Sequence, residues 1–325
     1  MTGKMEGHCG RPKWNQVSVM AHNPYVVVVG GANLDIAGKP AGPLVPRDSN
    51  LGTIRLSAGG VGRNIAHNLA LLGVDVKLVT CFGEDPQADA LIESCTEAGI
   101  DLAHAFAVRG GATSTYLYVT DETGEMQMAI NDMDILEHLT PERLHERRKL
   151  IEGAAIVVVD TNLSIESLRW MAGHTKAPLF CDPISTTKAH KLEGMLGALH
   201  TIKPNLQEAE VLADMPITDE DSLLQAARRI VKSGLDQVFI SLGAEGLLCM
   251  SREQTLRLPL MPGAVRNTNG AGDAMAAGLV WARLKGMGLR EAGHAGLAAS
   301  AIAIESDETV NPLMSEHLLR ERMTR

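Results

Sequence analysis

The fold is indicated by the stretch YVVVVGG, Tyr25–Gly31, in which four valines in a row end at two glycines. A strand that is buried on both faces has this pattern. Similar apolar runs follow at 76–79, 155–159, 178–181 and 237–241, and helical patterns separate them at 62–72, 87–98, 141–152, 222–233 and 273–285. Buried strands that alternate with helices predict an α/β fold, with a mainly parallel central sheet covered by helices on both faces.

Two segments interrupt this alternation, at 37–57 and 104–131. Both predict short strands with polar alternation, and Asp121–Gly124 is a good hairpin turn between runs at 115–119 and 126–130. We expect them to form a small sheet that projects from the main domain as a lid. Residues 25–325 then form one domain, and residues 1–24, which show no periodicity, form a flexible N-terminal extension.

Composition excludes several classes of protein. The 325 residues carry a net charge of −9, which argues against a nucleic-acid partner. Five widely spaced cysteines with no C-x-x-C pair indicate reduced thiols. No apolar run is long enough to span a bilayer, and residues 1–24 lack the apolar core of a secretory signal. We therefore expect a cytoplasmic protein without a membrane partner; organelle targeting by residues 1–24 stays open.

The sharpest local motif is NTNGAGD, Asn267–Asp273, followed by a helix of small residues. Glycines let several backbone N–H groups converge, and the helix adds the positive end of its dipole. The motif thus predicts an anion site next to the carboxylate of Asp273. A plain alternative is a tight loop whose helix is capped by Asp273.

Two other glycine clusters lie near predicted strand ends. GGVGRN, Gly59–Asn64, precedes a helix and alone could be a close turn. GGANLD, Gly30–Asp35, follows the first strand, at the end where open α/β sheets bind ligands. Asn33 and Asp35 alternate along an extended segment, so both can face one cleft and hold vicinal hydroxyls. An Asx-type turn would explain them equally well.

Two further motifs suit a metal and a nucleotide. In KPNLQE, Asn205 and Glu208 lie one helical turn apart, where an amide and a carboxylate can organise the water shell of Mg²⁺. A solvated helix face would also explain this pair. SLGAEG, Ser241–Gly246, follows a buried strand, and its backbone can approach nucleotide phosphates; alone it is simply a turn.

Taken in order, these motifs resemble the ribokinase-like (PfkB) family from Tyr25 to about Pro312. Gly59–Asn64 is similar to the G-G-x-G-x-N segment near the sugar, and Asn205 with Glu208 to the N-x-x-E motif near the metal. Gly243 and Gly246 match the G-x-x-G turn at the nucleotide, and 267–273 the D-T-x-G-A-G-D signature. The resemblance implies the ribokinase-like fold and an ATP-dependent sugar kinase.

The resemblance is narrower still to the pseudouridine kinases within that family. Its most informative part lies in the lid, in TGEM at 123–126 and AINDM at 129–133. It implies transfer of the γ-phosphoryl group to the 5'-hydroxyl of pseudouridine. One departure is Asn267, which replaces the leading Asp of the signature and leaves a monovalent-cation (K⁺) site in doubt.

The resemblance also implies the role of each candidate residue. Asp273 is the general base, and N–H groups of Gly270, Ala271 and Gly272 stabilise charge on the γ-phosphoryl oxygens. The substrate-binding residues are Asn33, Asp35, Gly59, Gly60, Asn64, Thr115, Asn131 and Asp132. The ATP-binding residues are Asn205, Ser241, Gly243, Gly246, Gly270 and Gly272, with Mg²⁺ held through water by Asn205 and Glu208. The family also implies a homodimer formed through the lid.

Three other functions are compatible with parts of the sequence. A kinase of the same family could act on ribose, adenosine or another nucleoside or sugar. A non-catalytic nucleotide-binding protein could keep the fold, although the intact Asp273, Asn205 and Glu208 argue against it. A dinucleotide-dependent oxidoreductase is disfavoured, because the glycines after the first strand lack the G-x-G-x-x-G spacing.

Overall fold

The computed structural model describes residues 24–324, and its central feature is an eight-stranded sheet in the order β14-β13-β12-β11-β10-β9-β1-β4. All of the predicted N-terminal extension except Pro24 lies outside the described residues. The strands are β1 (Tyr25–Val29), β4 (Asp75–Val79), β9 (Ile156–Asp160), β10 (Leu179–Asp182), β11 (Thr201–Ile202), β12 (Gln237–Ser241), β13 (Leu247–Ser251) and β14 (Thr255–Leu258). Neighbours from β4 to β12 are parallel, and β13 and β14 add an antiparallel edge.

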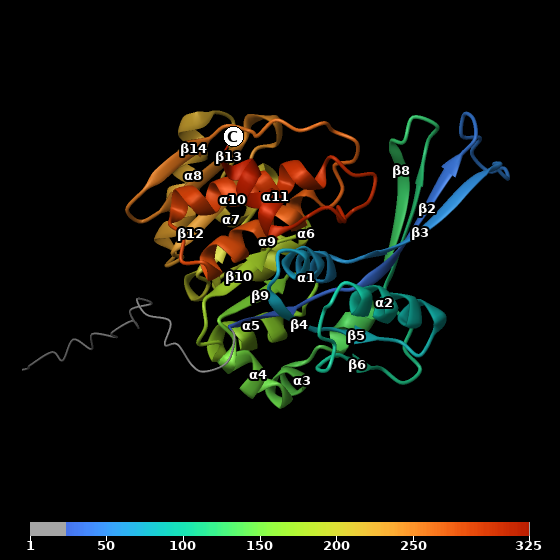
Figure 1. Ribbon diagram of the computed structural model, residues 1–325, viewed down its shortest axis with the longest axis horizontal. Coiled ribbons are helices and arrows are strands. Elements are labelled where there is room, and N and C mark those ends of the chain that lie inside the picture. Colours follow the sequence, from blue (N-terminus) through green and yellow to red (C-terminus); the bar gives the residue numbers. More distant parts are fainter. Residues whose placement is uncertain (1–23, 325) are drawn as a thin grey trace, which may run out of the picture.

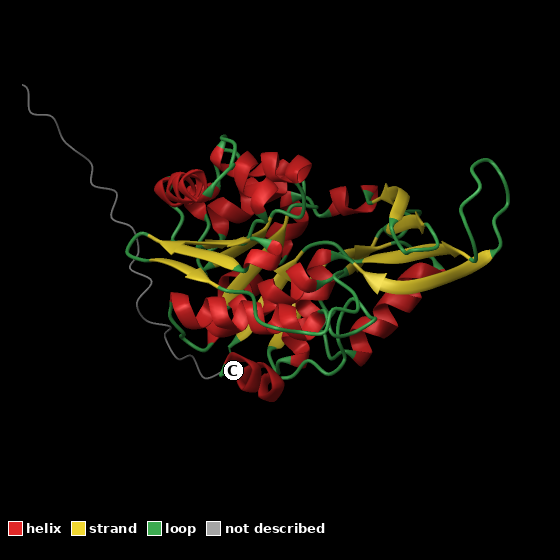
Figure 2. Cartoon of the chain, turned by 90° about the horizontal axis from the view of Figure 1, so that it is seen from above, coloured by secondary structure: helices red, strands yellow, loops and turns green. Residues whose placement is uncertain are grey.

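Helices cover both faces of this sheet, as predicted (Figure 2). Alternate residues of β1 enter opposite cores: Val26 and Val28 pack into one, Val27 and Val29 into the other. The first core contains residues of α1 (Val61–Leu71), α9 (Ala271–Leu284), α10 (Leu289–Ala303) and α11 (Glu316–Met323). The second contains residues of α3 (Pro141–Glu146), α4 (Arg148–Gly153), α5 (Ile165–His174), α7 (Leu206–Ala213) and α8 (Glu220–Lys232). The unbroken valine run is therefore explained by burial on both sides.

One predicted helix is wrong in its extent. The pattern at 141–152 predicts a single helix, but Arg147 has φ −102° and ψ 11° and separates α3 from α4. The remaining helices are α2 (Pro86–Glu97) and α6 (Thr186–Ala189), with 3₁₀ turns at Asp134–His138, His190–Leu192, Leu196–Ala198 and Gly243–Glu245. No helix in the described part of the chain has the length and apolar character to cross a bilayer.

A four-stranded sheet in the order β3-β2-β7-β8 projects from the main body (Figure 1). Its strands are β2 (Asn33–Pro40), β3 (Gly52–Gly59), β7 (Thr115–Thr120) and β8 (Met126–Asp132). The predicted hairpin is confirmed, because β7 pairs with β8 in antiparallel fashion around the Asp121–Gly124 turn. β2 begins at Asn33, four residues before the expected segment, and continues almost directly from β1.

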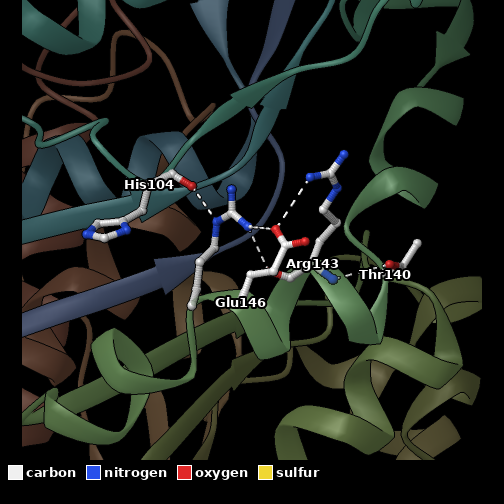
Figure 3. A network of polar contacts seen from close by, with 5 residues as sticks. His104, Thr140, Arg143 and Glu146 are labelled. Atoms are coloured by element: carbon white, nitrogen blue, oxygen red, sulfur yellow. Dashed lines mark hydrogen bonds and ion pairs between the residues drawn. The ribbon is translucent and has the colours of Figure 1, made fainter.

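Residues 104–114 do not join this small sheet. β6 (Phe106–Ala107) pairs instead with β5 (Cys81–Phe82) in a separate two-stranded sheet. An arginine network fastens this region to α3 (Figure 3). Arg147 donates from Nε to the His104 carbonyl (2.6 Å), and its guanidinium and that of Arg143 lie over the Phe106 ring. The chain is thus anchored to the main body before it enters β7.

The strand order places a crevice at β1. The chain runs from β1 to β4 on one side and then returns to β9 on the other side of β1. Open α/β sheets bind ligands outside the carboxyl ends of the strands where the order reverses in this way. The loops after β1, β9 and β10 are therefore the expected location of a site.

Candidate active site

Asp273 lies in the first turn of α9, and its carboxylate faces a neighbouring helix. The N-cap of α9 is Gly270, with φ +79°, and no side chain caps this helix end. The plain alternative, a helix capped by Asp273, is therefore wrong. The Asp273 carboxylate instead accepts a hydrogen bond from Asn64 Nδ2 (2.8 Å), which joins α9 to the N-terminal turn of α1. Ala271 donates its N–H to the Thr268 carbonyl (3.3 Å), so it is less available to a ligand than a free N–H group.

The surroundings of Asp273 shift its pKa strongly upward. Burial raises this pKa from 3.8 to about 7, and the nearby carboxylate of Asp182 adds to the shift. The hydrogen bond from Asn64 and the positive charge of Lys203 oppose it, and Asp160 raises it further. A carboxylate whose pKa is close to neutral can both accept and release a proton under physiological conditions. This pKa makes Asp273 a candidate general base.

Asn33 and Asp35 lie side by side at the start of β2. Asn33 Nδ2 donates to Asp35 Oδ1 (2.6 Å), so their side chains share one face of the strand. Asp35 pairs across the ladder with Ser57 and touches Gly59, which has no room for a side chain there. Burial raises the pKa of Asp35 to about 6. The pair presents polar atoms beside the glycines that precede α1.

Arg63 connects these residues to Asp273. Arg63 is 4% exposed; its guanidinium donates to Asn64 Oδ1 (3.1 Å), and its charge lowers the pKa of Asp35. Asn64 therefore receives a hydrogen bond from Arg63 and donates one to Asp273. The amide orientation of Asn64 is determined by these two partners, which aim its donor at the carboxylate.

The three candidates on β7 and β8 do not share one side of the small sheet. Asn131 pairs with Tyr116, which pairs with Asp35, so Asn131 belongs to the row of Asp35. Thr115 and Asp132 pair with each other and with the row of Leu34. Because neighbouring residues in a strand point to opposite faces, this row lies on the other side of the sheet. Of the three, the structure brings only Asn131 to the face that carries Asp35.

Asn205 and Glu208 form a capping box at the start of α7. Asn205 Oδ1 accepts the Glu208 N–H (2.9 Å), and Glu208 Oε2 accepts the Asn205 N–H (2.9 Å). Glu208 is nonetheless only 3% exposed, and burial and the charge of Asp182 raise its pKa. Asn205 is exposed, so the alternative of a solvated helix face fails only for Glu208. One carboxylate oxygen of Glu208 is free of the capping box.

A buried ion pair lies between Asp273 and Glu208. Lys203 Nζ is 3.2 Å from Asp182 Oδ2, and both side chains are almost completely buried. Burial lowers the pKa of Lys203, but the charges of Asp182 and Glu208 outweigh it and raise this pKa above its usual value. A Cβ on Gly272 would lie 3.5 Å from Lys203 Nζ. A fixed positive charge therefore stands next to the uncapped N-terminus of α9.

The predicted nucleotide turn lies beside Asn205. Ser241, the last residue of β12, forms a β-bridge with Asn205 and donates its N–H to the Pro204 carbonyl (2.9 Å). Gly243 and Gly246 follow in a tight turn with φ +56° and +90°. Asn267 is half-buried: its Oδ1 accepts the Asn269 N–H (3.0 Å), and its Nδ2 donates to the Asp307 carbonyl (3.3 Å).

Sequence reasoning missed four charged residues around this site, namely Arg63, Asp160, Asp182 and Lys203. Each stands within or next to a motif or strand that the sequence does indicate: Arg63 in GGVGRN, Lys203 in KPNLQE, Asp160 and Asp182 just after the predicted strands. A charge at the carboxyl end of a buried strand was the available signal. No group of three or more His, Cys, Asp or Glu among residues 24–324 is arranged to ligate a metal directly.

Comparison with known proteins shows the family to which this chain belongs. The model of the pfkB family of carbohydrate kinases matches residues 23–316. The chain therefore belongs to this family, and it is a sugar or nucleoside kinase, a phosphotransferase whose acceptor is an alcohol group. The family resemblance seen in the motifs is confirmed.

Two relatives and one solved structure show how similar the chain is to individual kinases. The pseudouridine kinase of Escherichia coli K12 is 36% identical over 299 residues, which cover 91% of this chain and 95% of that protein. The uncharacterized sugar kinase YeiI of the same organism is also 36% identical over 299 residues, covering 91% of this chain and 83% of that protein. The solved structure of Arabidopsis thaliana ribokinase complexed with ribose and ATP has a TM-score of 0.82 at 22% identity, covering 94% of this chain and 100% of that chain. The ribokinase-like fold is thereby confirmed.

Proposed function

We propose that this kinase transfers the γ-phosphoryl group of ATP to the 5'-hydroxyl of pseudouridine, giving pseudouridine 5'-phosphate and ADP. The choice of pseudouridine rests on the similarity to the Escherichia coli pseudouridine kinase over 91% of the chain. The motifs at 123–126 and 129–133, which lie in and after the β7–β8 hairpin, support the same substrate. The chemistry rests on one observation: the carboxylate of Asp273, with a pKa of about 7, stands at the uncapped N-terminus of α9.

The proposed reaction uses this arrangement directly. Asn33, Asp35 and Asn64 hold the ribose so that its 5'-oxygen faces Asp273. Asp273 accepts the proton as that oxygen attacks the γ-phosphorus, while the N-terminus of α9 and Lys203 stabilise charge on the phosphoryl oxygens. Phosphoryl transfer depends chiefly on such in-line positioning and charge stabilisation. The small sheet acts as a lid that excludes water.

A Mg²⁺ ion fits the charge balance near Asn205 and Glu208. Asp182 interacts electrostatically with three other acidic groups, Asp160, Glu208 and Asp273, and the nearby basic groups are Lys203, which is buried, and Lys188, which interacts with Asp160. A bound cation would offset the excess negative charge, and the ion would supply neutralisation of the ATP phosphates. Because Mg²⁺ keeps much of its water shell, Asn205 and Glu208 would hold it through water.

A substrate panel tests the proposed function. The protein is assayed for ADP release with pseudouridine, uridine, adenosine and ribose at equal concentrations, with Mg²⁺ and ATP present. We expect kcat/KM to be highest for pseudouridine. A higher kcat/KM for ribose or adenosine would refute the proposed substrate but keep the kinase. Absence of ADP release that depends on an added sugar would instead favour the non-catalytic alternative.

We also propose that two copies of the chain associate through the lid. Leu56, Ile36, Leu117 and Ile130 form one row across the small sheet, on the face opposite to Asp35. Three of these side chains are more than a third exposed, and Ile54 and Met128 of the next row are 78% and 63% exposed. An apolar sheet face of this kind marks an interaction surface. The open strand edges of β3 and β8 also need cover.

Sedimentation velocity tests this association. We expect the wild-type chain to sediment as a dimer and Ile130→Glu as a monomer, because a buried unpaired carboxylate is costly. Leu313→Glu is the matched control, since Leu313 is at least as exposed (72%, against 63% for Ile130) but lies outside the small sheet. A wild-type monomer at micromolar concentration, or an Ile130→Glu dimer, would contradict the proposal.

A further inference from the structure

The carboxylate of Asp160 lies at the point where the strand order reverses, and it binds three backbone N–H groups. Asp160 Oδ2 accepts the N–H of Gly31 (2.8 Å) and that of Gly62 (2.9 Å), and Oδ1 accepts the N–H of Asn162 (2.9 Å). Asp160 is 1% exposed. One buried side chain therefore connects the loop after β1, the first turn of α1 and the loop after β9.

These segments carry the residues assigned to the sugar. The loop after β1 leads within two residues to Asn33, and the first turn of α1 holds Asn64, which binds Asp273 (2.8 Å). The three segments are also in tight contact around the carboxylate. A Cβ on Gly62 would lie 2.9 Å from the backbone of Gly30 and 3.0 Å from Asp160 Oδ2. The Asp160 side chain therefore helps to set the spacing between the two segments, together with the Arg63 N–H, which donates to the Gly31 carbonyl (3.0 Å).

We infer that Asp160 is a positioning residue for the sugar: it holds the Asn33 and Asn64 segments in register and places its carboxylate near that of Asp273. The inference rests on the proposed assignment of Asn33 and Asn64 to the ribose. Asp160 does not touch the reacting atoms in this arrangement. It acts through the two backbone segments and through its charge.

The charge of Asp160 makes the inference distinguishable from a purely structural role. The charged and polar groups that interact with Asp273 are Asp182, Asn64, Lys203, Asp160 and Arg63, and Asp160 raises its pKa. Loss of that negative charge lowers the pKa of Asp273. The acid limb of the kcat/KM profile, which reports this group in the free enzyme, then moves to lower pH. Burial raises the pKa of Asp160 itself, whereas the N–H groups of Gly31 and Asn162 and the charge of Lys188 lower it; Lys188 and Asp182 both stay in place in the variant.

The test is Asp160→Asn, assayed with the substrate that the wild-type enzyme phosphorylates best. An amide has one acceptor oxygen and places an N–H₂ donor against a backbone donor, so at least one of the three contacts is lost. We expect the KM for the nucleoside to rise about tenfold to a hundredfold, the factor for one charged hydrogen bond. The KM for ATP should change less than about twofold, because the turn proposed to bind the nucleotide makes no contact with Asp160 and so loses no hydrogen bond in the variant.

Two comparisons complete the test. Asp101→Asn, which removes a carboxylate that binds the Ala103 N–H and Lys77, should leave both KM values and the pH profile unchanged. Gly62→Ala adds a methyl group 2.9 Å from the Gly30 backbone and 3.0 Å from Asp160 Oδ2 but changes no charge. It should therefore raise the KM for the nucleoside and leave the acid limb of the pH profile in place. If Asp160→Asn does not fold, the KM of Gly62→Ala for the nucleoside decides whether the spacing of these segments positions the sugar.

Three results would overturn the inference: an unchanged nucleoside KM in the folded variant, a parallel rise of both KM values, or an acid limb of Asp160→Asn that stays at the wild-type pH. A wild-type enzyme that prefers ribose would change the proposed substrate and leave this inference standing. Wild-type protein without kinase activity would instead refute the proposed function.

Discussion

Replacement of Asp273 by Asn should slow the reaction and stabilise the protein at the same time. The amide keeps the size of the side chain and can still accept the hydrogen bond from Asn64. It cannot take the proton of the sugar hydroxyl. Loss of a general base is worth about 10² to 10⁴ in rate, or about 2.7 to 5.5 kcal/mol in the activation barrier. We expect kcat to fall by that factor with saturating ATP and nucleoside.

The effect on stability follows from the raised pKa of Asp273. The folded state holds this proton up to about pH 7, whereas the unfolded chain releases it near 3.8. The fold therefore loses stability as pH rises from about 4 to 7, and above pH 7 the cost is at most about 4 kcal/mol, since each pKa unit corresponds to about 1.36 kcal/mol. An amide removes this cost. Urea unfolding at pH 8 should show Asp273→Asn to be more stable than the wild type, with the difference vanishing towards pH 4.

A matched control separates the two effects. Asp219 is the exposed N-cap of α8, and hydrogen bonds from Ser222 lower its pKa. Asp219→Asn should leave kcat unchanged and should give no stability gain at pH 8. The wild-type kcat/KM should also fall about tenfold per pH unit below pH 7, a limb that Asp273→Asn lacks. A kcat of Asp273→Asn within tenfold of the wild type would refute the role of Asp273 as general base, and a stability gain that is the same at pH 5 and pH 8 would refute its raised pKa.

Lys203→Met should leave the Asp182 carboxylate buried without its partner, which typically costs about 3 to 5 kcal/mol in the free energy of unfolding. It should also move the acid limb to higher pH, because Lys203 lowers the pKa of Asp273; a limb that moves to lower pH would contradict this assignment. Gly246→Ala should raise the KM for ATP and leave that for the nucleoside unchanged, since φ is +90° and a Cβ there would collide with the Leu258 carbonyl. Gly243→Ala, which meets open space, is the milder control; equal KM values for ATP in the two variants would argue against contact between this turn and the nucleotide.

The large sheet could be predicted from the sequence because its signal is local. Four valines in β1 serve two cores, so the run is apolar at every position and ends where the strand ends. The bounds of β1 and β12 agree with the sequence patterns, β4 starts one residue earlier than its pattern, and β9 and β10 are shifted by one residue at both ends. The prediction of one continuous helix at 141–152 was wrong, because the chain breaks between α3 and α4 at Arg147, whose side chain contacts a distant segment. Arg147 binds the His104 carbonyl, which no periodicity within 141–152 can indicate.

The sequence by itself determined the type of fold and the motifs of the site, because burial pattern and glycine spacing are properties of neighbouring residues. Only the tertiary structure decided how those motifs act on one another. It brings Asn64 to Asp273 across 209 positions and places Asp160 between Gly31 and Gly62. It also puts Thr115 and Asp132 on the face of the small sheet away from Asp35. The raised pKa of Asp273 has the same origin, since burial and the field of Asp182 exist only once the chain has folded.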